Sequence, residues 1–112
     1  MDAEEIRNYA LSKPEAWEDT PFGEGNLVFK FREKMFLLLS LDSSPVTFNV
    51  KCDPLRAVSL REQYDAVQPG YHMNKKHWNT ITVDGTLGSS LLKEMIDHSF
   101  ELIGGRQTRK KK

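Results

Sequence analysis

The chain has 112 residues, 38% hydrophobic and 29% charged, and its 16 Lys and Arg balance 16 Asp and Glu to a net charge of zero at pH 7. This is the size and composition of one small soluble domain, and it excludes nucleic-acid binding through bulk positive charge. No apolar run approaches the ~20 residues of a membrane span, and the acidic start is unlike a secretory signal. A single cysteine excludes an internal disulfide and fits a reducing compartment. We therefore expect a cytoplasmic protein, and without a membrane span we expect no membrane partner.

Charge is unevenly distributed along the chain. The first 24 residues hold seven acids against Arg7 and Lys13, whereas residues 106–112 hold no acid. We expect residues 1–105 to form one domain and 106–112 to be a disordered basic tail that either binds nucleic acid weakly or aids solubility. The bases of that tail are Arg106, Arg109, Lys110, Lys111 and Lys112.

The first half of the chain predicts a helix followed by three strands. Residues 2–12 have acids in the first turn and Pro14 beyond the end, which is typical of a helix. Residues 13–26 contain two Pro and two Gly and indicate a loop. Strands follow at 27–32, 35–41 and 46–51, the first and third with alternating apolar residues and the second nearly all apolar, as in a central strand.

The second half predicts two helices separated by a hairpin. Asp53 and Pro54 favour a helix start, and that helix should run to about Tyr64 and bury Leu55 and Val58. Strands are expected at 67–72 and 77–83, joined by a turn at 73–76 in which Asn74 adopts the left-handed conformation that Asn tolerates. A last helix should begin at Ser89 or Ser90, run to about residue 103 and stop at Gly104.

The expected element order is therefore α-β-β-β-α-β-β-α. Grouped strands with helices between the groups indicate an α+β, two-layer fold, with a largely antiparallel five-stranded sheet and helices on one face. The core should include Ile6, Phe29, Phe31, Phe48, Val58, Ile81, Met95 and Ile96.

Two features mark a candidate site. The segment 69–80, Pro-Gly-Tyr-His-Met-Asn-Lys-Lys-His-Trp-Asn-Thr, concentrates polar and aromatic residues that are costly to bury together, so we expect it at the surface. Strand alternation places a second group of residues, Lys30, Arg32, Lys51 and Trp78, on the sheet face opposite the core. Cations beside an aromatic residue suit a single-stranded nucleic acid or another anionic ligand, although they could also simply solvate an open sheet. The candidate residues are Lys30, Arg32, Lys51, His72, Asn74, Lys75, Lys76, His77 and Trp78.

The chain resembles the MmcQ/YjbR-like proteins, small bacterial proteins of about this length. The resemblance is carried by Thr20-Pro21-Phe22-Gly23, by 36–39, by Lys51-Cys52-Asp53-Pro54, by Asp97-His98-Ser99-Phe100 and above all by 69–80, and it covers residues 2–103. It implies a two-layer α+β fold like that of secretion chaperones. It also implies DNA binding, because the fold is similar to a double-wing DNA-binding domain. It implies no catalytic residues.

Other chemistries have weaker support in the sequence. His72 and His77 flank a four-residue turn, but two imidazoles do not complete a zinc site, so we expect no metal and no other cofactor. Cys52 lacks a base and should be a small buried residue. We therefore expect a non-enzymatic binding protein, with DNA as partner through the 73–77 turn and the basic sheet face. The alternative is a protein-interaction or chaperone-like module that acts as a dimer.

Overall fold

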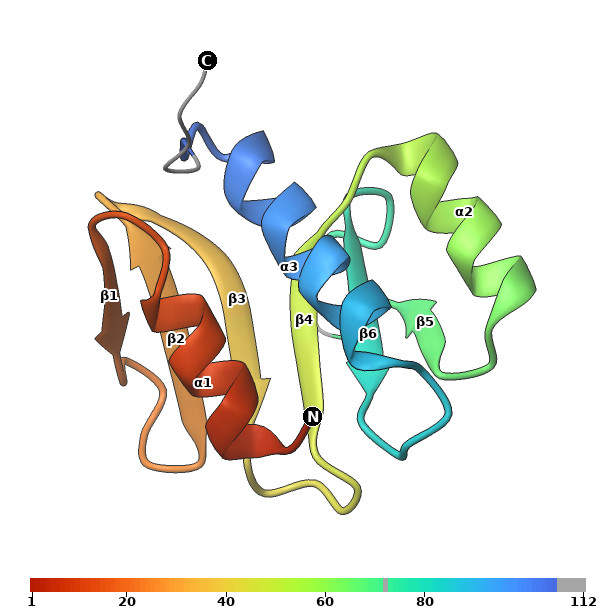
Figure 1. Ribbon diagram of the computed structural model, residues 1–112, viewed down its shortest axis with the longest axis horizontal. Coiled ribbons are helices and arrows are strands. Elements are labelled where there is room, and N and C mark those ends of the chain that lie inside the picture. The colour runs from red at the N-terminus through yellow and green to blue at the C-terminus, as the bar shows by residue number, and fades with distance from the viewer. Residues whose placement is uncertain (72, 107–112) are drawn as a thin grey trace.

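A computed structural model describes residues 1–71 and 73–106 (Figure 1). Three helices and six strands follow one another along the chain. They are α1 (Ala3–Leu11), β1 (Ala16–Asp19), β2 (Asn26–Phe31), β3 (Lys34–Ser40), β4 (Thr47–Lys51), α2 (Pro54–Gln63), β5 (Val67–Pro69), β6 (Trp78–Thr82) and α3 (Ser89–Leu102). No helix of the described ranges is long and apolar enough to cross a bilayer.

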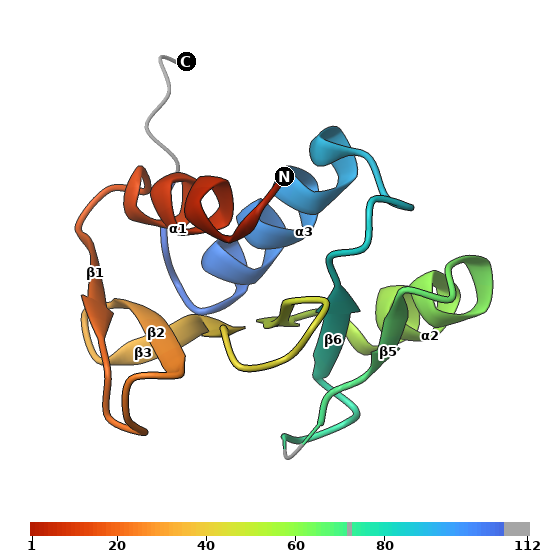
Figure 2. The same cartoon turned by 90° about the horizontal axis from the view of Figure 1, so that it is seen from below.

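The six strands form one sheet in the order β1-β2-β3-β4-β6-β5, and every neighbouring pair is antiparallel. Helices α1 and α3 lie together on one face, whereas α2 lies beside the β5 edge (Figure 2). The other face carries no helix, and we call it the open face. The α+β, two-layer arrangement is thus confirmed.

The core lies between the sheet and the helix pair α1 and α3. Fully buried aromatic and aliphatic side chains from both layers fill it, and Phe100 of α3 packs edge-on against Phe36 and Phe31, with ring centroids 5.1 and 5.4 Å apart. All the expected core residues are buried except Val58. Strand alternation located this core because an antiparallel sheet covered on one side buries every second side chain.

Strand β1 corrects the expectation of five strands, because residues 16–19 belong to a segment that reads as a loop. Ala16, Trp17, Glu18 and Asp19 show no alternation of apolar residues, and Trp17 is exposed. The strand forms because its main chain pairs with β2 from Ala16 opposite Phe31 to Asp19 opposite Val28. At a sheet edge, main-chain pairing suffices and the side-chain pattern is weak.

The expected buried face of α2 is also wrong. Ala57 and Leu60 are buried, while Leu55 is 84% and Val58 48% exposed. The helix starts as expected, since the Asp53 carboxylate accepts hydrogen bonds from the main-chain N–H groups of the first turn. The helix contacts β5 at the end of the sheet rather than the middle of its face, so a different side of it is covered.

A bulge in β3 turns two successive side chains into the core. The register between β2 and β3 shifts between Phe29 and Lys30, and Phe36 and Leu37 are both fully buried. Ser99 of α3 anchors this point: its hydroxyl donates to the Phe36 carbonyl at 2.6 Å and accepts from the Lys51 N–H at 2.9 Å. Helix α3 is thereby tied to the sheet where β3 begins and β4 ends.

Candidate functional site

A row of five side chains crosses one end of the open face. In the sheet register Trp17 lies opposite Lys30, Lys30 opposite Met35, and Lys51 opposite Trp78. Between β3 and β4 the last paired residues are Leu37 and Val50; Lys51 follows Val50, and Met35 lies beyond Leu37 with the bulge residue Phe36 between them. We call these five residues the cross-strand row. The structure thus brings Lys30, Lys51 and Trp78 to one face, as strand alternation predicts.

The β1 end of the row is tightly held. Lys30 is three-quarters buried, forms an ion pair with Asp19 at 3.2 Å and places its ammonium 5.1 Å above the ring of Trp17. The indole N–H of Trp17 donates to the Arg32 carbonyl at 2.8 Å. This network leaves 43% of Trp17 exposed. The indole is therefore a fixed aromatic surface rather than a mobile one.

The other end of the row adjoins the turn 73–77, and this turn is built by its own side chains. The Asn74 side chain accepts from the Lys76 N–H at 2.9 Å, and the Asn74 carbonyl accepts from the Trp78 N–H at 2.9 Å. The ammonium of Lys75 donates to the Gly70 carbonyl at 3.1 Å. Lys75 therefore helps to close the turn, while Lys76 is exposed and has no ion-pair partner among the described residues.

The backbone of the turn differs from expectation at Asn74 and requires a glycine at position 70. Among the described non-glycine residues, positive φ occurs at Glu15 and Arg32, so a left-handed conformation is not how Asn74 makes its turn. Gly70 is required for a different reason: a Cβ there would lie 2.8 Å from the Cβ of Trp78. The two strands approach too closely at this point for any side chain.

Arg61 of α2 fixes the turn from the side, and sequence reasoning missed it. Its Nε donates to Oδ1 of Asn79 at 2.8 Å, and its Nη2 donates to the carbonyls of Lys75 and Trp78. Asn79 is 1% exposed, and its Nδ2 has no hydrogen-bond partner within the described part of the chain. A lone arginine on a helix gives no sequence signal for this role, because the role depends on how α2 meets the hairpin.

The two ends of the sheet carry opposite charge. Because the strands are antiparallel, the turns after β2, β4 and β5 all lie at the end that holds the cross-strand row. We call this the cationic end; counting the strand ends and the turn before β1, its bases are Lys13, Lys30, Arg32, Lys34, Lys51, Lys75 and Lys76, and its acids are Glu15, Glu33 and Asp53. At the opposite end, loops 20–25, 41–46, 64–66 and 83–88 contain Glu24, Asp42, Asp65 and Asp84 and no Lys or Arg.

Arg32 belongs to the cationic end but not to the open face, which corrects its expected position. Strand β2 ends at Phe31, and Arg32 sits in the hairpin turn with φ of +59° and its guanidinium 5.0 Å from the Phe31 ring centroid. Beside it a surface hollow of about 480 Å³ is lined by Phe31, Arg32, Glu33, Lys34, Ile103 and Gly104. The end of α3 therefore lies at the cationic end, and the expected tail 106–112 lies outside the described residues except for Arg106, which is exposed.

The remaining candidates do not form a metal or nucleophilic centre in the described chain. His72 lies outside the described residues, and His77 is half-buried. No three His, Cys, Asp or Glu side chains gather closely enough in residues 1–71 and 73–106 to hold a metal ion. Cys52 is buried, as expected, and its burial raises the pKa of the thiol, which disfavours the nucleophilic thiolate.

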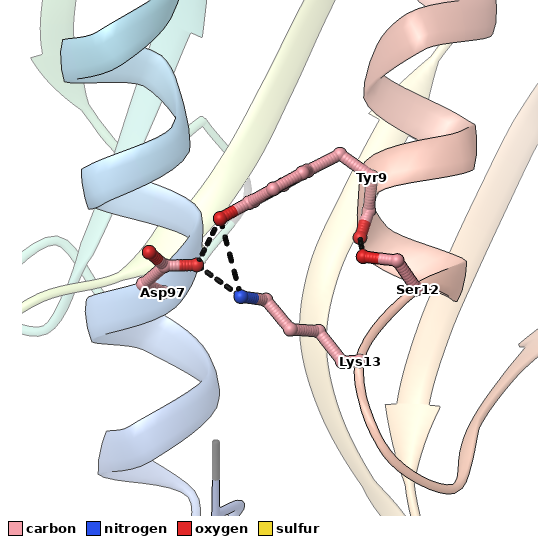
Figure 3. A network of polar contacts seen from close by, with 4 residues as sticks. All are labelled: Tyr9, Ser12, Lys13 and Asp97. Carbon is pink, nitrogen blue, oxygen red and sulfur yellow. Dashed lines mark hydrogen bonds and ion pairs between the residues drawn. The ribbon is translucent and has the colours of Figure 1, made fainter. Parts of the chain in front are cut away.

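A polar network that the sequence did not indicate joins α1 to α3 (Figure 3). The Asp97 carboxylate accepts from the Tyr9 hydroxyl at 2.6 Å and from the ammonium of Lys13, which is 7% exposed. Burial, the hydrogen bond to Asp97 and the charge of Asp97 all raise the pKa of Tyr9. Tyr9 therefore stays protonated and holds the two helices together rather than serving as a base.

A sequence model of the YjbR family matches residues 11–102. The chain belongs to the YjbR family. It is 34% identical over 100 residues to YbdF of Escherichia coli O157:H7 (89% of this chain, 82% of that protein) and 28% identical over 101 residues to YjbR of Escherichia coli strain K12 (90% and 86%). Both relatives are named as uncharacterized proteins, so their names assign no activity.

A solved structure with a similar level of sequence identity has the same fold. A crystal structure of a Deinococcus radiodurans protein superposes with a TM-score of 0.84 at 34% identity, covering 91% of this chain and 78% of that one. The expected family and its α+β fold are thus confirmed.

Proposed function

We propose that this YjbR-family protein binds nucleic acid, DNA in the first instance, at the cationic end of its sheet, and that it does so without catalysis. The observation that carries the proposal is the separation of charge between the two ends of the sheet. A polyanion is attracted to the end that holds Lys51 and Lys76 and repelled from the end that holds Glu24 and Asp84. The neutral net charge hides this arrangement.

The shape of the cationic end suits the same partner. The β5–β6 hairpin ends in the turn 73–77, which presents the exposed ammonium of Lys76 to an approaching polyanion. Arg61 and Asn74 preorganise the turn, so little ordering is needed when it binds.

A protein partner is the second candidate, because α2 exposes Leu55 and Val58 one helical turn apart. Adjacent exposed apolar side chains on a helix are typical of a contact surface. Two residues supply too little area for a stable interface, so this candidate stands behind nucleic acid.

Binding is tested with a protein whose tail makes no electrostatic contribution. In this tail-neutral protein Arg106, Arg109, Lys110, Lys111 and Lys112 are each replaced by Gln. Fluorescence anisotropy of a labelled DNA oligonucleotide, offered as a single strand and as a duplex, measures affinity as salt is raised. We expect binding at low salt that weakens steeply, and Lys51→Gln with Lys76→Gln should reduce the log–log salt slope by about 0.7–0.9 per lost phosphate contact.

Lys93→Gln is the matched control, because Lys93 is exposed on α3 beside the Tyr9 ring, on the helical side of the sheet. It should leave the slope unchanged. The proposal fails if the tail-neutral protein binds neither form of DNA at low salt. It also fails if the Lys51 and Lys76 variant binds as well as the Lys93 control.

A further inference from the structure

We infer that the cross-strand row is a stacking platform for a single-stranded nucleic acid, which lies across the open face rather than entering as a duplex. This inference rests on the proposed function and narrows its ligand. The row places an aromatic residue at each end, Trp17 and Trp78, with Lys30, Met35 and Lys51 between them.

The aromatic ends of the row favour unpaired bases. Bases in a duplex stack on each other and hide their faces, whereas those of a single strand are free to stack on indole rings, and each such stack is worth about a 5- to 150-fold change in affinity. Trp17 is preorganised for this contact by the Arg32 carbonyl and the Lys30 ammonium, and it remains 43% exposed.

The charge on the open face also fits a single strand better than a duplex. Lys30 is already paired with Asp19, which leaves Lys51 as the cation of the row without an ion-pair partner among the described residues. A duplex carries a phosphate charge about every 1.7 Å and requires many cations. A surface with few cations and two aromatic residues therefore obtains more of its affinity from stacking than from phosphates.

The dimensions of the open face allow a flexible chain to cross it. Trp17 and Trp78 are four strand spacings apart, or about 19 Å along the sheet. The loop 20–25 and the turn after β5 both project beyond the sheet on the side away from α1 and α3 (Figure 2). Such projections hold a rigid duplex off the sheet, while a single strand can follow the surface between them.

The chain offers a direct optical test because Trp17 and Trp78 are its two tryptophans. The full-length protein is titrated with an oligo-dT of about 12 nucleotides, within known site sizes, and with its duplex with oligo-dA. We expect the single strand to bind more tightly and to quench the intrinsic fluorescence. Trp17→Phe and Trp78→Phe leave one reporter each, and both reporters should be quenched.

The affinity variants separate stacking from general attraction. Trp17→Ala should lower single-strand affinity about 5- to 150-fold, the range for one lost stack. Leu102→Ala is the control, since Leu102 is 44% exposed on α3, which covers the opposite face of the sheet, and it should change nothing. Unfolding midpoints show whether the variants are folded. If an alanine variant is unfolded, the test rests on the fluorescence quenching of Trp17→Phe and Trp78→Phe.

The outcomes distinguish this inference from the proposed function. If the duplex binds as tightly as the single strand and Trp17→Ala has no effect, while Lys76→Gln weakens binding, the platform is refuted and the nucleic-acid proposal stands. If neither form of DNA binds, both are refuted. Preferential single-strand binding with quenching of both tryptophans supports both.

Discussion

Arg61 and Asn79 meet at the junction of α2 and β6, where Nε of the arginine donates to Oδ1 of the buried amide at 2.8 Å. The same guanidinium reaches the carbonyls of Lys75 and Trp78. One side chain from a peripheral helix thus determines the conformation of the turn that presents Lys76.

We predict that Arg61→Ala destabilises the protein by about 1–3 kcal/mol, because Asn79 loses its partner inside the fold. Urea unfolding measures this change, and hydrogen exchange should show faster exchange of the turn amides. Arg56→Ala on the same helix is the control: its pair with Glu94 is largely exposed and should contribute no more than about 1 kcal/mol. Equal effects of the two variants would contradict this role of Arg61.

We predict that Ser99→Ala costs about 2–3 kcal/mol, since it leaves the Phe36 carbonyl and the Lys51 N–H without their partner. The midpoint of urea unfolding at constant slope reports the loss. Ser59→Ala is the comparison, because Ser59 is exposed on α2 and its hydroxyl accepts a hydrogen bond from the exposed Gln63 side chain. A Ser99 variant as stable as the Ser59 variant would show that the hydroxyl does not anchor α3.

We predict that Asp97→Ala destabilises the protein by about 2–3 kcal/mol, because the buried ammonium of Lys13 loses its ion pair with Asp97 and the Tyr9 hydroxyl loses its acceptor. The expected cost is below that of a fully buried pair, since the Asp97 side chain is 36% exposed. Asp97→Asn should cost less, because its amide oxygen still accepts from Tyr9, and it should lower the pKa of Tyr9 in an alkaline absorbance titration. An unchanged tyrosine titration would mean that the charge of Asp97 does not raise the pKa of Tyr9.

We predict that stability falls as pH drops below neutral, in part through His98. Burial and the nearby Arg56 lower the pKa of His98 below its ordinary value of 6.5, and Nε2 accepts a hydrogen bond from the Asp53 N–H at 3.1 Å. The folded state thus favours neutral imidazole. The stabilisation that His98 contributes is complete above its ordinary pKa of 6.5 and is lost as the pH falls through the lower pKa of His98 in the folded state.

The measurement is the unfolding free energy between about pH 7.5 and pH 5 for the wild type and for His98→Gln, whose side-chain oxygen can replace Nε2 as acceptor. The wild type should lose more stability than the variant over this range. Parallel curves would mean that His98 does not titrate differently in the folded and unfolded states.

The sequence predicted what depends on local pattern and missed what depends on tertiary placement. Asp2 and Glu5 form the capping box that starts α1, and Gly104, at φ of +100°, follows α3 as expected. The predicted buried face of α2 was wrong, because apolar residues lie on both sides of this helix and only its contact with β5 decides which side is covered. Lys13 and Asp97 are 84 residues apart, so only the packing of α1 on α3 brings them together.

The same distinction between local pattern and tertiary placement applies to the residues of the candidate site. Alternation assigned Lys30, Lys51 and Trp78 to one face, because successive side chains of a strand point to opposite faces and the face of each residue follows once the strands are located. Arg32 was misplaced because β2 ends one residue earlier than expected. Trp17 escaped notice because its strand is recognisable only from its pairing with β2.

The central claim, nucleic-acid binding at the cationic end, is tested most directly by mapping where the ligand lies. The measurement is a ¹H–¹⁵N NMR titration of the tail-neutral protein with an oligo-dT of about 12 nucleotides. We predict shifts concentrated at residues 30–34, at Lys51, at 74–78 and at both tryptophan indoles. Shifts confined to α1 and α3 or to the acidic loops, or no shifts at low salt, would contradict the account.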